Sequence, residues 1–237
     1  MSEVAVVPDV ARAAAELFVE STAGAVAARG TAAVALTGGS TAAPLYAELL
    51  KSWTVPWEKL QIFFTDERAV PETSELSNYR IAREALLEKV KPAAVHRLRG
   101  EASDLQQEAD RAAADLRNTL GSPPRLDLML LGLGPDGHIL SLFAGVPESA
   151  DRGDGELVRP TAAPTQVEPK VARLTLTPFL VVTARTVVLQ VCGAKKAAVL
   201  ARVLKGPEDL VACPAQWLRK ASGRVVIVAD SAAASGL

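Results

Sequence analysis

Short apolar runs alternate with longer stretches of mixed polarity along this chain. The runs are rich in Val, Ile, Leu and Ala, which is typical of strands buried on both faces of a sheet, and the stretches between them place apolar residues at helical spacing. We predict strands at residues 4–7, 32–36, 60–65, 95–98, 126–131, 173–177, 186–191 and 224–229. We predict helices at residues 9–29, 42–51, 77–89, 103–120, 193–205 and 214–220, and a short one at 139–143.

Strands that alternate with helices of ten or more residues predict the α/β class. We expect a doubly wound, mostly parallel sheet with helices on both faces, as in Rossmann-like folds. Residues 145–170 are rich in Gly, Pro and Asp and are predicted to form a surface excursion, so we expect a single domain over residues 1–237. Ligands of such a sheet bind at the carboxyl ends of its strands.

The composition of the chain limits the classes of molecule that it could bind. The net charge is -1, which leaves no basic surface for nucleic acid or an anionic membrane. No apolar run approaches the ~18–20 residues of a membrane span, and the N-terminus lacks the charged start of a secretory signal. Cys192 and Cys213 show no disulfide or metal spacing and are expected to be reduced thiols. We therefore expect a cytoplasmic protein.

The first candidate site is the glycine-rich turn at residues 132–138. It follows an apolar run of strand length and carries Asp136, Gly137 and His138, one of two histidines in the chain. In open α/β sheets, the functional site is usually found at such turns, which follow the carboxyl ends of buried strands. An ordinary strand-to-helix turn with a hydrogen-bonded histidine is the alternative.

The second candidate is the segment formed by Gly38, Gly39, Ser40 and Thr41, between a predicted strand and a predicted helix. Glycines let the backbone approach a ligand, and free N–H groups at a helix start attract anions. This pattern favours a phosphate site, and the alternative is a helix cap without a ligand.

Two basic side chains, Arg68 and Lys196, could bind an anion. Arg68 follows Asp66 and Glu67, and Lys196 begins a late helix. Surface ion pairing and a solvated lysine are the alternatives. The other histidine, His96, is expected to be structural. Neither the spacing of a metal site nor a nucleophile elbow is present in the sequence.

Five segments together resemble the 6-phosphogluconolactonases, within the wider glucosamine-6-phosphate deaminase and ribose-5-phosphate isomerase superfamily. They occur in the order of that family and are residues 36–41, residues 65–68 with 77–79, residues 132–138 with 141–143, residues 173–177 and residues 193–197. The chain departs from the family pattern at Ala42, at Ile139 and Leu140, and at residues 178–182.

The resemblance implies hydrolysis of 6-phospho-D-glucono-1,5-lactone to 6-phosphogluconate, the second step of the oxidative pentose phosphate pathway. It implies His138 as the general base that activates water and Asp136 as its helper. It implies no metal and no cofactor, and a sugar phosphate as the partner. We expect a monomer or a small homo-oligomer. The residues implied to bind phosphate and sugar are Gly38, Gly39, Ser40, Thr41, Asp66, Arg68, Gly137, Arg173 and Lys196.

Two other functions remain as alternatives. Amino-sugar phosphate deaminases carry a carboxylate five residues after the corresponding histidine, where this chain has Phe143. A sugar-phosphate sensor would bind the ligand without turnover, but residues 1–31 are too short and too weakly charged for the DNA-binding domain such proteins carry. A turnover assay separates these functions.

Overall fold

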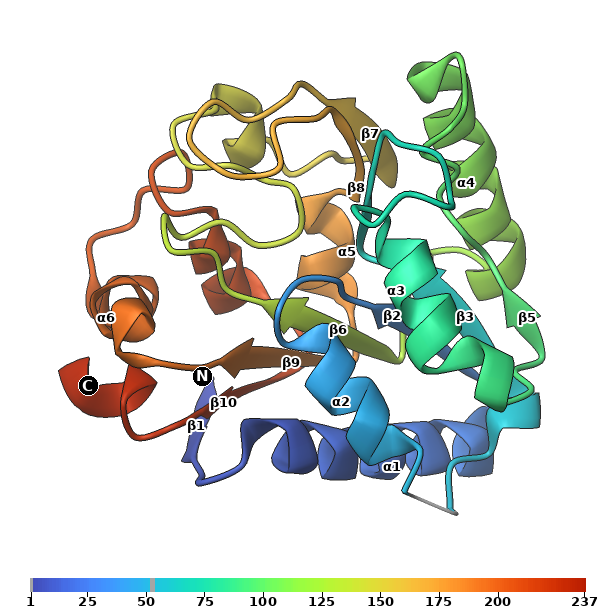
Figure 1. Ribbon diagram of the computed structural model, residues 1–237, viewed down its shortest axis with the longest axis horizontal. Coiled ribbons are helices and arrows are strands. Elements are labelled where there is room, and N and C mark those ends of the chain that lie inside the picture. Colours follow the sequence, from blue (N-terminus) through green and yellow to red (C-terminus); the bar gives the residue numbers. More distant parts are fainter. Residues whose placement is uncertain (1, 52–53) are drawn as a thin grey trace.

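A seven-stranded parallel sheet forms the centre of the computed structural model, which describes residues 2–51 and 54–237 (Figure 1). The strand order is β1-β10-β9-β6-β2-β3-β5. The central strands β2, β6 and β9 are buried along nearly all of their length, as their apolar runs require. The bounds are β1 Glu3–Val6, β2 Ala32–Leu36, β3 Leu60–Phe64, β5 Ala94–Val95, β6 Leu128–Gly132, β9 Thr186–Val191 and β10 Arg224–Ala229.

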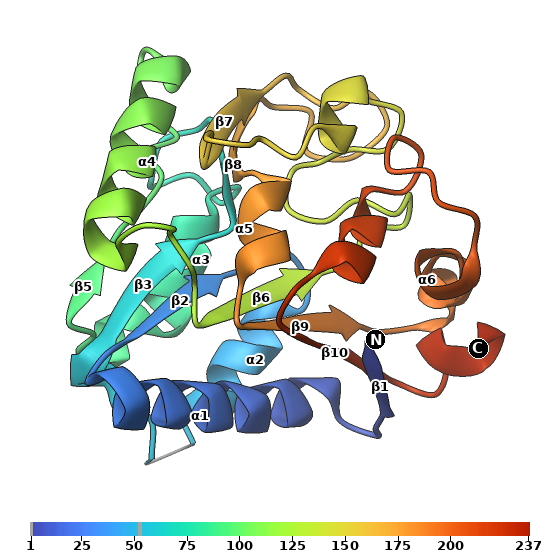
Figure 2. The same ribbon diagram turned by 180° about the vertical axis from the view of Figure 1, so that it is seen from behind.

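Helices cover both faces of this sheet, which confirms the predicted doubly wound α/β class. In Figures 1 and 2, α1 and α2 lie below the sheet and α4 and α5 lie above it. Asp9 caps α1 by accepting a hydrogen bond from the Arg12 amide, and Gly30 ends it with a φ of 78°. The bounds are α1 Val10–Arg29, α2 Ala42–Leu49, α3 Asn78–Ala85, α4 Leu105–Leu120, α5 Pro178–Thr183 and α6 Ala197–Lys205.

The strand order reverses between β2 and β6. From β2 the chain adds β3 and β5 on one side, and from β6 it adds β9 and β10 on the other. The connections that leave β2 and β6 therefore diverge and leave a crevice at the carboxyl ends of these two strands. The glycine turns at residues 38–41 and 132–138 both border this crevice.

A small antiparallel sheet lies above the main one. Its order is β4 (Asp66–Arg68), β8 (Arg173–Leu176) and β7 (Val158–Thr161). Thr65 joins the two sheets, because its N–H donates to Leu36 of β2 and its carbonyl accepts from Leu176 of β8. The sequence did not predict β4 or β7 as strands, and β7 lies within the surface excursion expected over residues 145–170.

Residues 139–143 do not form the predicted helix. Ile139 and Leu142 make an isolated antiparallel bridge, and Leu140 has a φ of 56°. The Ser141 hydroxyl donates to the Asp66 carboxylate at 2.7 Å, which ties this segment to the floor of the crevice.

The other differences are small. The structure adds α5, whose start Pro178 suits a first helical turn, and shortens the strand predicted at residues 95–98 to β5. Short 3-10 helices are η1 Trp57–Lys59, η2 Leu87–Lys89, η3 Pro147–Ala150, η4 Ala194–Lys196, η5 Pro214–Lys220 and η6 Ala233–Gly236. Among the described residues, none of the helices is long and apolar enough to cross a membrane.

Candidate active site

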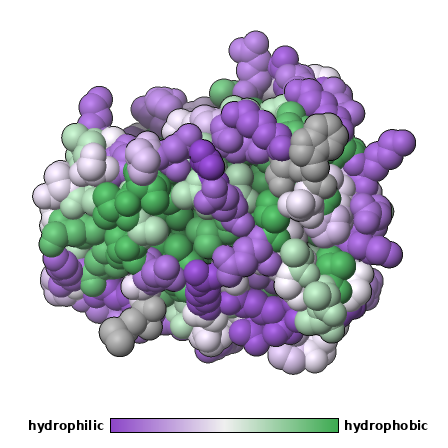
Figure 3. Space-filling view, turned by 90° about the horizontal axis from the view of Figure 1, so that it is seen from below, coloured by the Kyte–Doolittle hydropathy of each residue, from purple (hydrophilic) through white to green (hydrophobic). Residues whose placement is uncertain are grey.

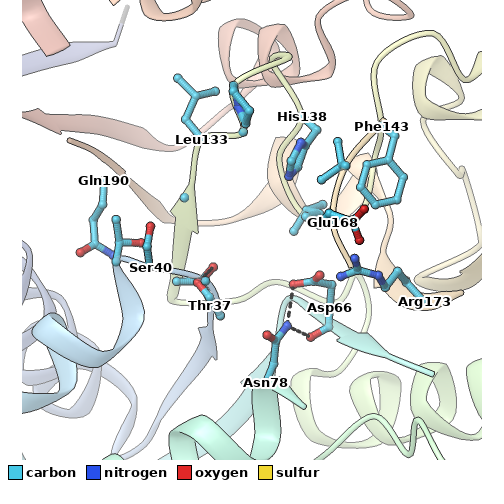
Figure 4. A pocket seen from close by; sticks show the side chains of 18 of the residues that line it. Thr37, Ser40, Asp66, Asn78, Leu133, His138, Phe143, Glu168, Arg173 and Gln190 are labelled. Carbon is cyan, nitrogen blue, oxygen red and sulfur yellow. Dashed lines mark hydrogen bonds between the residues drawn. The ribbon is translucent and has the colours of Figure 1, made fainter. Parts of the chain in front are cut away.

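A cavity of about 310 Å³ opens at the crevice where the strand order reverses. Strands β2, β6 and β9 bring their carboxyl ends to it, and β4 and β8 of the small sheet close another side. In Figure 4, His138, Phe143 and Arg173 gather at one side of the cavity, and Ser40, Leu133 and Gln190 lie at the other. Most of the predicted site residues thus meet in one place, although they are far apart in the sequence.

The turn after β6 orients His138. The imidazole Nδ1 lies 2.5 Å from Oδ1 of Asp136, and that oxygen also accepts the His138 backbone N–H at 3.2 Å. The Gly134 N–H donates to the His138 carbonyl at 2.8 Å and closes the turn. A Cβ at Gly134 would overlap the imidazole ring, so only glycine lets the ring pack there.

Asp136 is an ionised hydrogen-bond acceptor. Partial burial raises its pKa, but the hydrogen bond and the charge of His138 lower the pKa by more, to about 2. An ionised carboxylate can only accept hydrogen bonds, so Nδ1 of a neutral His138 is the donor and Nε2 keeps a free lone pair. This is the tautomer that a general base needs.

The turn between β2 and α2 forms the opposite wall of the cavity. Gly39 has a φ of 77°, and the Ala42 N–H that begins α2 bonds to the Gly39 carbonyl. Thr41 at the N-cap makes no side-chain capping bond, and within the described chain no partner binds the hydroxyls of Ser40 and Thr41. Two hydroxyls and a helix start therefore stay available for an anion.

Arg68 and Arg173 face each other across the small sheet. They are partners in the antiparallel register of β4 and β8, and both line the cavity. Burial and then the charge of Arg68 lower the pKa of Arg173, with Asp66 and Glu67 opposing. Like charges directly opposite in a sheet repel, so an anion between them is favoured.

Lys196 supplies a third cation. Its ammonium donates to the Leu133 carbonyl at 2.7 Å, which places it against the turn that carries His138. Burial lowers the pKa of Lys196, and the charge of Asp136 opposes this change.

Asp66 and Glu67 fix the positions of the residues around Arg68. Asp66 accepts from the Ser141 hydroxyl and from the Asn78 side-chain amide, as the dashed lines to Asn78 in Figure 4 show. Glu67 is buried, which raises its pKa, while hydrogen bonds from Tyr79, Asn78, Arg68 and Ser77 oppose the rise. Glu67 thereby ties the start of α3 to β4.

Two predicted site residues do not line this cavity. Asp136 lies behind His138 and borders a second cavity of about 670 Å³. Gly137, with a φ of 96°, packs against Cys213, so its role is to shape the turn.

The sequence reasoning missed Asn78, Glu168 and Gln190, which also line the cavity. Gln190 has a signal in the sequence, because it is a single polar residue in an apolar strand run. Glu168 has none, since it is an exposed carboxylate in a loop. Within the described part of the chain, we find no cluster of His, Cys, Asp and Glu that could hold a metal ion.

An α/β protein with anion-binding groups and an Asp–His pair at its strand ends is the class that this fold and cavity define. A family model described as glucosamine-6-phosphate isomerases/6-phosphogluconolactonase matches residues 7–227. The chain belongs to this family, which confirms the predicted resemblance.

Relatives and solved structures agree with that membership. A 6-phosphogluconolactonase of Synechocystis is 36% identical over 219 residues, covering 90% of this chain and 88% of the relative. One of Mycobacterium tuberculosis is 34% identical, with 90% of each chain covered. The structure of 6-phosphogluconolactonase from Trypanosoma brucei matches with a TM-score of 0.87 at 30% identity and covers 100% of this chain and 99% of its own.

A monomeric glucosamine-6-phosphate deaminase shares the fold. Its structure gives a TM-score of 0.84 at 20% identity and covers 100% of both chains. At that identity, only the architecture is comparable.

Proposed function

We propose that this chain hydrolyses 6-phospho-D-glucono-1,5-lactone to 6-phospho-D-gluconate. The observation that carries the proposal is a histidine, oriented by an ionised carboxylate, in one cavity with three cations and a glycine turn at a helix start. The lactone has the two features that such a cavity can use, an ester carbonyl open to water and a phosphate. The 6-phosphogluconolactonases to which the chain is similar support the same reaction.

His138 acts as the general base in this proposal. Its Nε2 takes a proton from a water molecule while the water oxygen attacks C1 of the lactone and forms a tetrahedral oxyanion. The bond from C1 to the ring oxygen then breaks, and the imidazolium returns its proton to the ring oxygen, which becomes a hydroxyl. Asp136 keeps the imidazole in the required tautomer and stabilises the imidazolium.

The cations and the glycine turn hold the substrate. The Gly39–Thr41 segment, Arg173 and Lys196 are proposed to bind the phosphate and sugar, as charge-assisted hydrogen bonds favour. Arg68 is the candidate donor to the oxyanion, because its buried Nε has no hydrogen-bond partner in the described part of the chain. Asp66 is proposed to accept a hydrogen bond from a sugar hydroxyl.

The same cavity argues against deamination. Phe143 lies next to His138, with ring centroids 5.3 Å apart, at the position where deaminases carry a carboxylate. Glu168 brings a carboxylate into the cavity from another loop, so the assay must include an amino-sugar phosphate.

The setting of the reaction is also part of the proposal. We propose one catalytic domain over residues 1–237 in the cytoplasm, which the free thiols of Cys192 and Cys213 favour. We propose a monomer or a small homo-oligomer as the state of assembly. A broad apolar area on the face seen from below would allow a small homo-oligomer (Figure 3).

The test is a coupled assay on freshly prepared lactone. Formation of 6-phosphogluconate is followed with 6-phosphogluconate dehydrogenase, and ammonia release from glucosamine 6-phosphate is measured in parallel. Turnover of the lactone without ammonia release supports the proposal. Ammonia release at a comparable rate would favour the deaminase, and binding without any turnover would favour a sensor.

A further inference from the structure

Gln190 is a polar residue in the middle of the sheet whose amide is unused. It stands near the end of β9, among apolar neighbours, and 1% of it is exposed. Neither Oε1 nor Nε2 has a hydrogen-bond partner in the described part of the chain. A buried amide without partners lowers stability, and an apolar residue of the same shape would cost nothing there.

The amide lies beside the turn that we assign to the phosphate. Gln190 pairs with Gly132 of β6 in the sheet register, and the Thr41 hydroxyl lies 3.4 Å from the place that a Cβ on Gly132 would occupy. Ser40 and Gln190 line the same side of the cavity in Figure 4. The hydroxyls of Ser40 and Thr41 also have no hydrogen-bond partner within the described residues, so three polar side chains without partners line the same cavity.

We propose that Gln190 is a positioning residue for the phosphate turn and thereby sets the preference for phosphorylated sugars. A hydroxyl whose oxygen accepts an N–H from the wall behind it is held with its own proton turned toward a phosphate oxygen. The Nε2 group has two N–H donors, one for each hydroxyl oxygen, so it can hold both O–H groups toward the phosphate. The proposal rests on the phosphate role of this turn stated above.

The experiment compares Gln190→Met with Gln61→Met. Methionine keeps the length of glutamine and removes the amide. Gln61 on β3 is a matched control, because its side chain lies outside the cavity and already forms a hydrogen bond of 2.9 Å with His96. Both variants are measured for KM and kcat on the phosphorylated lactone, for kcat/KM on unphosphorylated gluconolactone, and for thermal unfolding.

For Gln190→Met we expect KM for the phosphorylated lactone to rise about tenfold, with kcat within about twofold, because roughly one charge-assisted interaction is lost. Activity on the unphosphorylated lactone should not change, and Tm should stay the same or rise. Gln61→Met should show the reverse, a lower Tm and an unchanged KM.

An unchanged KM in Gln190→Met, equal losses on both lactones, or a lower Tm with normal KM would overturn the inference. Gln190→Leu gives the same comparison if the methionine variant does not fold. Failure of the phosphate assignment itself has a different signature, since the wild-type protein would then turn over both lactones equally well.

Discussion

His138 lines the cavity and Asp136 lies behind it, and together they form an acid–base pair that can take up a proton and release it again. The ring is held by the Asp136 carboxylate at 2.5 Å and by the close approach of Gly134. His138→Asn keeps size and polarity but removes the base, so kcat should fall by ~10²–10⁴. KM should move little, because the groups assigned to the phosphate remain. A folded His138→Asn protein with near wild-type kcat would refute the mechanism.

The pH profile tests the role of Asp136. Its pKa is lowered to about 2, so this carboxylate stays ionised over the whole range in which the enzyme can be assayed. A fixed negative charge beside the imidazole fixes its tautomer and stabilises the imidazolium that forms when the ring takes a proton from water. In Asp136→Asn the plateau rate of the pH profile should fall, because the imidazolium loses its charged partner and the amide no longer fixes the tautomer. An unchanged plateau rate would show that the carboxylate does not assist His138.

Lys196 tests the phosphate assignment. Lys196→Met keeps the aliphatic stem and removes the charge, and should weaken binding of the phosphorylated lactone by about 1.5–3 kcal/mol, the range of hydrogen bonds to charged groups. The remaining activity on unphosphorylated gluconolactone should hardly change. Lys195→Met is the matched control on the neighbouring position, which does not line the cavity. Equal losses on both lactones would place Lys196 outside the phosphate site.

At this scale, the sequence locates residues that have a strong local context. His138 and Ser40 lie in glycine-rich turns at strand ends, and this local pattern identified them as candidate site residues. Arg173 was found through the family resemblance, and the structure supplies the physical reason, which is its register with Arg68. Glu168 reaches the cavity from a loop that no local pattern marks.

The turn after β6 is the element on which the proposed chemistry depends. Gly134→Ala would push a Cβ into the His138 ring, so we expect kcat to fall by at least tenfold as the ring is displaced. Gly24→Ala in the middle of α1 is the control, because nothing lies within 4 Å of its Cβ. It should stabilise the protein by about 0.5–1 kcal/mol and leave kcat unchanged. A fully active Gly134→Ala protein would mean that the ring is not fixed by this contact.

Elements whose sequence periodicity agrees with their burial were predictable, and those that depend on distant partners were not. Local sequence alone predicts the strands β2, β6 and β9, from their apolar runs, and the helix α1, from its capping residues. The strand β7 forms because β8 lies beside it, and its sequence Val158–Thr161 contains a proline that argues against a strand. The sequence of residues 139–143 predicts a helix. The Ser141 hydroxyl instead donates to Asp66, 75 positions earlier, and this contact holds the segment in a non-helical conformation.

The whole molecule brings the site together from six segments spread over residues 37–196, and both sheets contribute. A ligand that bridges these segments binds only the folded chain, so it should stabilise the fold as a unit. At a concentration of 100 times its Kd, 6-phosphogluconate should add about 2.7 kcal/mol, which corresponds to a rise in Tm of roughly 5–10 °C for a chain of this size. Gluconate at the same concentration should have almost no effect, because it lacks the group that the glycine turn, Arg173 and Lys196 are assigned to hold. Thermal unfolding with each compound, in wild type and in Lys196→Met, measures this. Equal shifts from both compounds, or an undiminished shift in Lys196→Met, would mean that the phosphate does not join the segments in the way the cavity indicates.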